Sequence, residues 1–313
     1  MSRPDIPFSL LALALGFGLA RISLCAVAAA RSLVLQRRAV PTAGLAVAAS
    51  AAGMVLLSLS LAWPERTALP ADMTVTLRLL VGAVLLGAGA LVNGGCYLGS
   101  ISYLGTGNLN FLFTLAGIAL FARWNGAAIP APASPTSGMP RSWTLGLGFA
   151  TFAAVLLLAW RSARSGAAGR GFPLRGPWPW RRAAACCGVV AAILFAFDPG
   201  WSYGRALEAL ANAGSRPPRW HDELPALSLF TGVGASALLA GRFRLVRPQW
   251  VRSARCLAGG ALMACGASRI PGGNDALLLW SIPGLTLHGL VAYALMLLTL
   301  IAAFAAGRAA NLR

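Results

Sequence analysis

Apolar runs separated by short polar segments make up most of this chain. They lie at about residues 8–30, 42–63, 79–92, 101–122, 143–160, 183–197, 226–240, 257–270 and 285–306. Lipid offers no partners to backbone N–H and C=O groups, so such runs cross a membrane as helices that satisfy their own backbone. Hydrophobic residues at 58% and charged residues at 11% exclude an ordinary water-soluble domain. The sequence therefore predicts an all-α integral membrane protein with about nine transmembrane helices.

Two glycine-rich breaks interrupt this apolar pattern. The first is NGGCYLG at 93–99 and the second is PGGND at 271–275. Unwound backbone in hydrocarbon is tolerated only where it is buried in protein or lines a polar path. The runs beside the breaks are shorter than the ~20 residues that a straight span needs, which indicates short re-entrant half-helices. We therefore expect a path near the membrane midplane whose backbone is formed by Gly94, Gly95, Gly99, Gly272 and Gly273.

The charge distribution predicts the orientation of the chain. All 26 basic residues are arginines, and the formal net charge is +18. They gather in short loops beside apolar runs, which is typical of cytoplasmic loops and not of nucleic-acid binding, so no nucleic acid is expected as a partner. The acids lie mostly in the loops at 65–72, 134–140 and 201–223, and nine crossings with the N-terminus outside and the C-terminus cytoplasmic satisfy both placements. The predicted cytoplasmic arginines are Arg31, Arg37 and Arg38, then Arg161, Arg164, Arg170, Arg175, Arg181 and Arg182, and finally Arg242, Arg244, Arg247, Arg252 and Arg255.

The two breaks divide the chain into related halves. Each break follows the third apolar run of its half, and an ungapped alignment of Gly94-Gly95 with Gly272-Gly273 extends back through the preceding helix. Runs one to four start from the outside and runs six to nine from the inside, so two inverted repeats are predicted. The predicted units are 1–125, the first repeat; 126–182, a Pro-rich outer loop at 129–140, the connecting fifth span and a basic cytoplasmic loop; and 183–313, the second repeat.

The first run carries an arginine well inside its apolar stretch. An arginine there costs about 3 kcal/mol on insertion scales, so Arg21 is expected to face the protein interior. Together with Arg269 it is predicted to draw an anion into the path. The run has an alternative interpretation as a secretory signal, because it ends in small residues at 26–30. Asp5, Arg21 and Cys25 argue against that interpretation.

Two cysteines are candidates for the lining of the path. Cys25 lies four residues after Arg21, and Cys96 lies inside the first break. A neutral thiol is a weak, polarizable donor, which suits a site that holds a soft sulfur anion briefly and then releases it. Packing is the competing interpretation, since free cysteine is among the most buried residue types. Packing is preferred for Cys186, Cys187, Cys256 and Cys265.

Polar residues follow the glycines of the second break. Asn274 and Asp275 follow Gly272-Gly273 and are candidates for the path. Two structural interpretations stay open beside that one. Asn274 caps the helix that follows the break, or Asp275 neutralises Arg269.

Motifs for other chemistry are missing from the sequence. The two histidines, His221 and His288, have no cysteine at metal-ligand spacing, so no metal site is predicted. Cys186-Cys187 is not a C-x-x-C pair, and no phosphate-binding Walker sequence is present. The chain is therefore predicted to be no enzyme and to need no cofactor.

Several of these motifs resemble those of the YeeE/YedE family of bacterial inner-membrane sulfur-compound transporters. GFGLARISLC at 16–25 is similar to the first-helix signature of the family, and GGCYLG at 94–99 resembles its Gly-Gly-Cys motif. GRFRL at 241–245 and the segment 259–275 are similar to its second half. The resemblance implies a permease for thiosulfate or a related small sulfur compound, built as an hourglass of inverted repeats with three cysteines along the path. Cys25 and Cys96 match two of them, and the chain departs from the third at Asn274.

The prediction is a multi-pass permease or channel of the bacterial inner membrane that imports a small sulfur-containing anion past Cys25 and Cys96. One alternative is a permease for a different small anion or sulfur/selenium species. Another is a non-transporting membrane subunit associated with sulfur metabolism, and the departure at Asn274 fits both alternatives equally well. The resemblance also leaves room for a soluble cytoplasmic sulfur-carrier protein as partner. A transporter should keep Arg21, Cys25, Cys96 and Arg269 on one internal surface, whereas a scaffold should scatter them.

Overall fold

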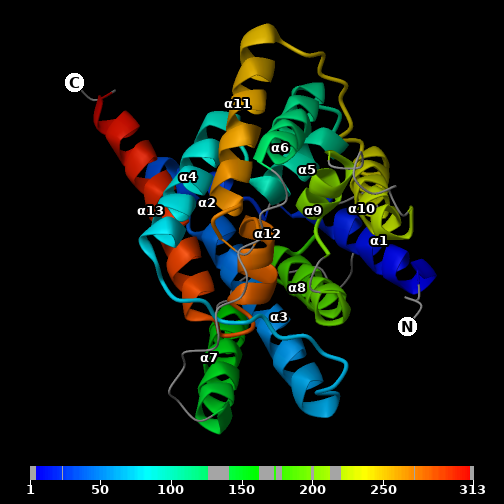
Figure 1. Cartoon of the computed structure of the whole chain (residues 1–313), viewed down its shortest axis with the longest axis vertical. Coiled ribbons are helices and arrows are strands. Elements are labelled where there is room, and N and C mark those ends of the chain that lie inside the picture. The colour runs from blue at the N-terminus through cyan, green and yellow to red at the C-terminus, as the bar shows by residue number, and fades with distance from the viewer. Residues whose placement is uncertain are drawn as a thin grey trace.

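The chain folds into a bundle of long and short helices (Figure 1). The computed structural model describes residues 5–22, 24–125, 141–161, 173, 178–198, 201–211, 220–270 and 272–310. Within these ranges every regular element is helical, and the β contact between Asn108 and Val246 is an isolated bridge. The all-α prediction is confirmed for this part of the chain. The Pro-rich segment 129–140, most of the basic loop after the fifth span, and Pro271 lie outside the described residues.

Long and short helices follow one another in the same order in the two halves: one long, one short, two long, one short and one long. The first half contains α1 (Asp5–Arg21), α2 (Ala26–Gln36), α3 (Val40–Ala62), α4 (Leu77–Asn93), α5 (Tyr97–Gly105), a 3-10 turn (Leu109–Phe111) and α6 (Leu112–Asn125). The connecting helix is α7 (Arg141–Arg161). The second half contains α8 (Trp180–Phe197), α9 (Tyr203–Ala211), α10 (Trp220–Leu239), α11 (Trp250–Ala267), α12 (Asn274–Ala276) with a π-helical turn (Leu277–Ser281), and α13 (Leu287–Ala310).

The helices are interrupted at more positions than the two glycine-rich breaks that were predicted. The first apolar run is divided by an extended segment that contains Leu24 and Cys25, and the fourth run is divided after Gly105. A short helix, α9, lies in the segment 201–223 that was predicted as an outer loop. The expectation of a single first helix is therefore wrong, because Cys25 has an extended backbone and begins α2 as its N-cap residue.

Among the described residues, five stretches are long and apolar enough to cross a membrane. They are Ile6–Gln36, Val40–Ala62, Leu77–Gly105, Trp180–Phe197 and Leu287–Ala310, and two of them join a long helix to the short one that follows it. Shorter apolar helices occur at Leu145–Arg161 and Leu224–Leu239. The chain is therefore a multi-pass membrane protein, while the number of nine spans stays a prediction.

Helix packing connects the two halves in a regular pattern. α1 packs against α10 and α3 against α8, and α4 packs against α11. α4 also packs against α13 as α6 does against α11, and α2 packs against α13 as α6 does against α9. Exchanging α1–α6 in order with α8–α13 maps the pair of α4 and α11 onto itself and converts each of the other pairs into another pair of the set. Two related halves would produce this pattern, although the inverted repeat itself stays a prediction.

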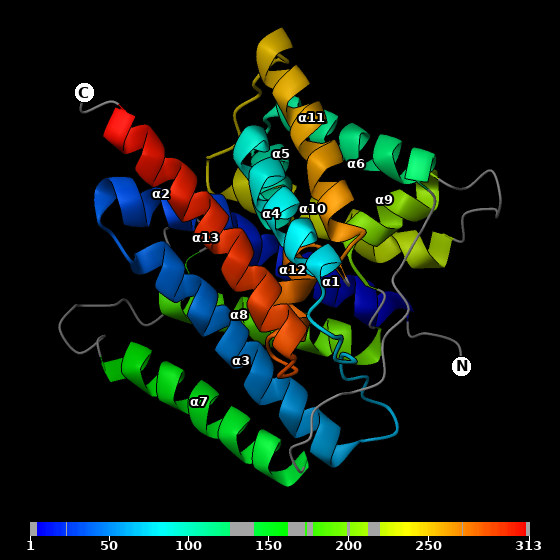
Figure 2. The same cartoon turned by 60° about the vertical axis from the view of Figure 1, so that its left-hand side comes forward.

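Close contacts between helices depend on small residues. A methyl group at Gly16 of α1 would overlap the carbonyl of Leu229 in α10, and one at Gly232 of α10 would overlap the carbonyl of Leu13 in α1. In lipid, helices associate through van der Waals contact, which is strongest where small residues let backbones approach. At the edge of the bundle, α7 lies along α3 (Figure 2). The ring of Phe152 in α7 packs against Gly53 of α3.

The loop between α3 and α4 is attached to the start of α13 by an acid. The Asp72 carboxylate accepts hydrogen bonds from the backbone N–H groups of Leu287 and His288, both at 3.3 Å, and thereby caps α13. Its Oδ1 also lies 2.8 Å from Nδ1 of the buried His288 ring. Burial alone would raise the pKa of Asp72, but the hydrogen bonds from His288, Leu287 and Met73 outweigh it and lower the pKa.

This attachment predicts a contribution to stability that is lost in acid. The Asp72→Ala variant should be destabilised by about 1–2 kcal/mol, the cost of removing a helix cap, and this should appear as a lower unfolding temperature of the protein in detergent. Since the folded pKa is depressed, the contribution is present above the ordinary carboxyl value of about 4 and disappears as the pH falls through the folded value.

Asp72→Asn is the matched control for the charge, because it keeps an acceptor oxygen at the cap. Its unfolding temperature should lie between those of the native chain and Asp72→Ala, with a weaker dependence on pH. Equal unfolding temperatures for all three proteins at pH 7 would contradict the stabilising role of the attachment.

Candidate functional site

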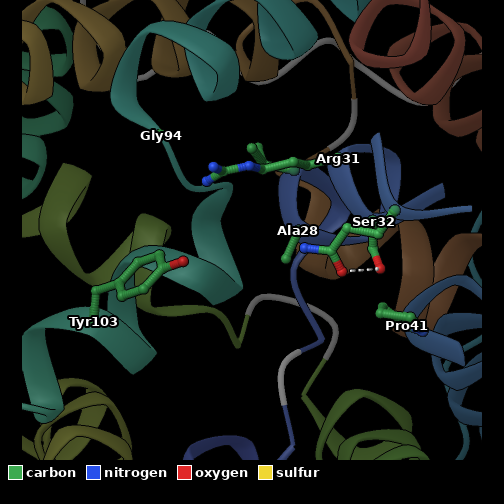
Figure 3. Close-up of a pocket in the computed structure, with 8 residues that line it drawn as sticks. Ala28, Arg31, Ser32, Pro41, Gly94 and Tyr103 are labelled. Carbon is green, nitrogen blue, oxygen red and sulfur yellow. Dashed lines mark hydrogen bonds between the residues drawn. The ribbon is translucent and has the colours of Figure 1, made fainter. Parts of the chain in front are cut away.

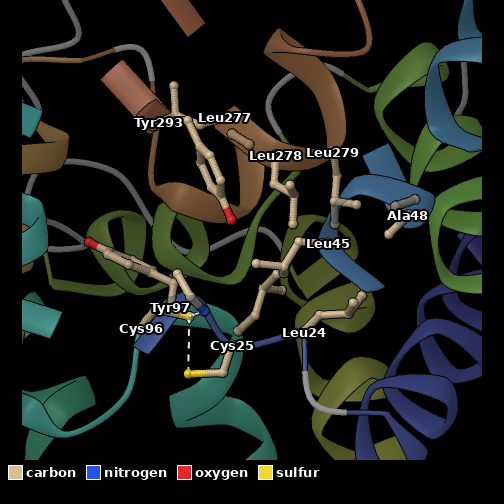
Figure 4. Close-up of a cluster of buried hydrophobic side chains, with 14 of the residues drawn as sticks. Leu24, Cys25, Leu45, Ala48, Cys96, Tyr97, Leu277, Leu278, Leu279 and Tyr293 are labelled. Carbon is tan, nitrogen blue, oxygen red and sulfur yellow. Dashed lines mark hydrogen bonds between the residues drawn. The ribbon is translucent and has the colours of Figure 1, made fainter. Parts of the chain in front are cut away.

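Two cysteines from separate breaks meet in the middle of the bundle. Cys25 is the N-cap residue of α2 and Cys96 that of α5, and both have extended backbones. Their Sγ atoms are 3.6 Å apart, and both side chains are almost completely buried (Figure 4). The Cys96 Sγ also accepts a hydrogen bond from the N–H of Ala26 at 3.4 Å. The thiols therefore lie at two helix N-termini, where the partial positive charge favours an anion.

A buried amide fixes the shape of the first break. The side-chain N–H₂ of Asn93 donates to the carbonyl of Gly95 at 2.6 Å and to the Ser100 hydroxyl at 2.8 Å. Its Oδ1 accepts from the Thr114 hydroxyl at 2.6 Å, and the Ser100 hydroxyl donates to the Cys96 carbonyl. Asn93 therefore provides a hydrogen-bond partner for a backbone group that has none within a helix. The sequence analysis did not assign it a role, although it begins the motif at 93–99.

Glycines at the two breaks have different tasks. Gly94 ends α4 at a φ of 76°, and Gly272 precedes α12 at a φ of 101°, values that favour glycine. Gly99 makes room for a thiol, since a Cβ there would lie 2.5 Å from the Cys25 Sγ. A Cβ at Gly273 would lie 2.6 Å from Oδ1 of Asp275 and 3.3 Å from the Tyr97 ring. The glycines predicted for the path therefore lie near the thiol pair and near the N-termini of the helices beside it.

Asn274 links the second break to the first. Its Oδ1 accepts a hydrogen bond from the N–H of Tyr97, the first residue of α5, at 3.0 Å. Gly273 is the N-cap residue of α12, so the interpretation that Asn274 caps its own helix is wrong. It satisfies a donor at the start of α5 instead. Its Nδ2 is buried and has no hydrogen-bond partner.

Asp275 and Arg269 do not form the ion pair that was considered. Oδ1 of Asp275 is buried without a hydrogen-bond partner, and no ion pair joins the two described side chains. Arg269 instead donates to the carbonyl of Cys265 at 2.5 Å and to its Sγ at 2.8 Å. The Arg269 guanidinium is therefore bonded to Cys265 in the last turn of α11, and the interpretation of a neutralising pair is wrong.

Arg21 also bonds outside the thiol pair. Its Nε donates to the hydroxyl of Ser236 in α10 at 2.8 Å, and the guanidinium lies over the rings of Phe17 and Trp178 at 5.2 and 5.8 Å. The side chain is buried, as its position in an apolar run requires. No hydrogen bond joins Arg21 or Arg269 to Cys25 or Cys96 in the described structure. Of the four residues proposed for one internal surface, the two thiols are therefore in contact and the two arginines bond elsewhere.

Tyr293 of α13 is a site residue that the sequence did not reveal. Its hydroxyl is buried without a hydrogen-bond partner among the described residues and points toward Tyr97 and Cys96 (Figure 4). A single tyrosine in the last apolar run gives no motif by which to recognise it. With Nδ2 of Asn274, the hydroxyl provides a second unpaired donor near the pair.

The other four cysteines lie away from the thiol pair, each in a different environment. Cys187 packs against Gly18, and the buried Cys256 donates weakly to the Asn93 carbonyl at 3.9 Å, as the packing interpretation expects. Cys265 accepts from Arg269, and Cys186 is exposed on the surface of α8. The described residues contain no group of three or more histidine, cysteine or acidic side chains that could hold a metal ion.

Comparison with known families identifies the class of this protein. A family described as sulphur transport matches residues 21–302. The chain belongs to this family, the YeeE/YedE family. The search of curated proteins gives no match. Family membership and the apolar helices together make the chain a multi-pass membrane protein of sulfur-compound transport, with a small sulfur anion as substrate class.

The contact between the thiols predicts that they can be cross-linked. In a chain whose other four cysteines are replaced by alanine, a short thiol-specific bifunctional reagent should join Cys25 to Cys96, because their Sγ atoms are 3.6 Å apart. Mass spectrometry of peptides from the treated protein should find the joined pair. Single replacement of Cys25 by serine is the control and should abolish the product.

A native-like protein whose two thiols react separately and never yield the joined peptides would contradict this geometry.

Proposed function

We propose that the chain is a permease or channel of the bacterial inner membrane that imports a thiosulfate-like anion past Cys25 and Cys96. The observation that carries the proposal is the thiol contact of 3.6 Å at the N-termini of α2 and α5. Soft, polarizable thiols suit the terminal sulfur of such an anion, and neutral donors release it more readily than a ring of cations would. The unpaired donors of Asn274 and Tyr293 support the same proposal, since a passing anion satisfies both.

We also propose an hourglass of two inverted repeats, residues 1–125 and 183–313, joined by 126–182. The exchange of helix pairs between α1–α6 and α8–α13 supports it. Nine crossings, with the N-terminus outside and the C-terminus cytoplasmic, agree with the arginine distribution. A soluble sulfur-carrier protein on the cytoplasmic side is the partner that this orientation suggests. Asn274, Asp275 and the glycines of both breaks belong to the proposed path.

The second break favours an alternative cargo. Position 274, which aligns with Cys96, holds an amide that is bonded to the N–H of Tyr97. The preceding N-cap residue of α12 is Gly273, where a Cβ would lie 2.6 Å from Oδ1 of Asp275. A path with two thiols instead of three suits an anion that needs fewer sulfur contacts, such as a different small oxyanion. A scaffold subunit is the less favoured alternative, since it gives no reason for two thiols to meet at two helix starts.

Uptake into proteoliposomes tests the proposal. Labelled thiosulfate should enter vesicles that contain the native chain, and Cys96→Ala should lower the rate about tenfold or more, the effect of removing a contact of about 1.4 kcal/mol or more from the path. Cys187→Ala is the matched control, because it removes a buried thiol outside the pair and should leave uptake unchanged. Sulfite and sulfate measured in parallel identify the cargo.

Equal uptake by the native chain and Cys96→Ala would overturn the thiol path. Uptake of sulfate or sulfite without thiosulfate would support the alternative cargo, and no uptake of any sulfur anion would favour the scaffold.

Asn274→Cys tests the departure at the second break. We expect it to lower thiosulfate uptake, because the variant loses the acceptor that pairs the N–H of Tyr97. Initial rates should be compared with those of the native chain at equal amounts of folded protein. A higher rate would contradict this expectation and would indicate that the amide replaced a functioning thiol.

A further inference from the structure

A cavity of about 410 Å³ lies between α2 and α5, next to the thiol pair but separate from it (Figure 3). Its lining contains one arginine, two side-chain hydroxyl groups, one side-chain amide and a glycine. The lining residues are Val27, Ala28, Arg31, Ser32, Gln36, Pro41, Gly94 and Tyr103. This volume is ample for a small oxyanion with some of its water, and the lining contains no acidic side chain. The cavity is therefore suited to an anion and not to a cation.

Arg31 supplies the charge of the cavity. Its guanidinium reaches into the open space between α2 and the loop at Gly94 (Figure 3). Arg21 and Arg269 are bonded to Ser236 and Cys265, but Arg31 has no hydrogen bond or ion pair with any described residue. A guanidinium presents several N–H donors in a fixed plane that fits two oxygens of an oxyanion at once. These donors face the cavity without a protein partner.

Tyr103 supplies a second, rigidly held donor. Its ring stacks on Phe111 with centroids 4.8 Å apart, and it lies against Gly95, where a Cβ would approach within 3.3 Å. The hydroxyl points into the same space as Arg31 and has no partner among the described residues (Figure 3). Tyr103 also lies within electrostatic range of Arg31 and of both thiols.

The backbone connects this cavity to the thiols. Gly94 in the lining precedes Cys96 by two residues, and Val27 follows Cys25 by two residues. The wall of the cavity is therefore continuous with the two breaks that hold the pair. Arg31 belongs to the arginines that the charge pattern predicts to be cytoplasmic, so an imported anion would meet the cavity after the thiols.

We propose that this cavity is a second anion subsite, which takes the oxyanion end of the sulfur compound as it leaves Cys25 and Cys96. Arg31 and the hydroxyl of Tyr103 donate to the oxygens of the anion, while the thiols contact its terminal sulfur at the preceding position. Because Arg31 is exposed, binding is weak enough for release. This inference rests on the proposed function and adds Arg31 and Tyr103 as the residues that bind the oxygen atoms of the anion.

Binding and uptake together test the subsite. Arg31→Gln should raise the Kd for thiosulfate about tenfold or more, the typical effect of losing a charge-assisted hydrogen bond, measured by calorimetry on the purified full chain. Tyr103→Phe should raise it by about threefold, as for a neutral hydrogen bond of about 0.7 kcal/mol. Arg38→Gln is the matched control, since it removes an exposed arginine from the same connection outside the cavity lining. The KM for thiosulfate uptake should change in the same order.

A structural role for Arg31 would give a different result. Arg31→Lys keeps the charge but not the planar donors, so it should restore part of the affinity, and all variants should unfold at the native temperature. If Arg31→Gln binds thiosulfate as tightly as Arg38→Gln does, the subsite is wrong, although uptake through the thiols still stands. If the native chain transports no sulfur anion, the proposed function fails, and binding of sulfate still decides the subsite: weaker binding in Arg31→Gln supports it, and unchanged binding overturns it.

Discussion

The structure depends on how the backbone N–H and C=O groups find hydrogen-bond partners where helices end inside the membrane. Lipid cannot pair an open N–H or C=O, so each break needs a protein partner. Asn93 supplies it for the carbonyl of Gly95, Asn274 for the N–H of Tyr97, and the sulfur of Cys96 for the N–H of Ala26. Two of these three partners come from a different segment of the chain. The breaks therefore support one another, and the thiols lie at the point where they meet.

In the proposed path, the sulfur and the oxygen atoms of the anion are recognised by different groups. The buried thiols, with the donors of Asn274 and Tyr293, form an environment without a bonded cation, which suits polarizable sulfur. The guanidinium of Arg31, which has no partner among the described residues, lies in a cavity beside it and is suited to bind oxygen atoms. A path that divides an anion between two kinds of contact binds neither end tightly, and weak binding at successive sites is what conduction requires.

The sequence predicted the helical membrane class and the glycine breaks, because these follow from hydropathy and from residues with unusual backbone freedom. It missed the break at Cys25, since that segment contains neither glycine nor proline and continues an apolar run. It also selected Arg21 and Arg269 by their depth in the apolar pattern, while their partners Ser236 and Cys265 are fixed only by packing. Tyr293 is brought to the thiols by the crossing of α13, which no local pattern encodes.

The hydrogen bond from Tyr97 to Asn274 has a consequence for how such a protein changes over generations. The amide at this position supports the start of α5 in the opposite half of the molecule. Once that support exists, a single exchange of asparagine for cysteine removes a structural partner at the same moment as it adds a reactive group. A third thiol at this position would therefore need a compensating substitution near Tyr97, and the two halves can differ in chemistry while their architecture remains linked.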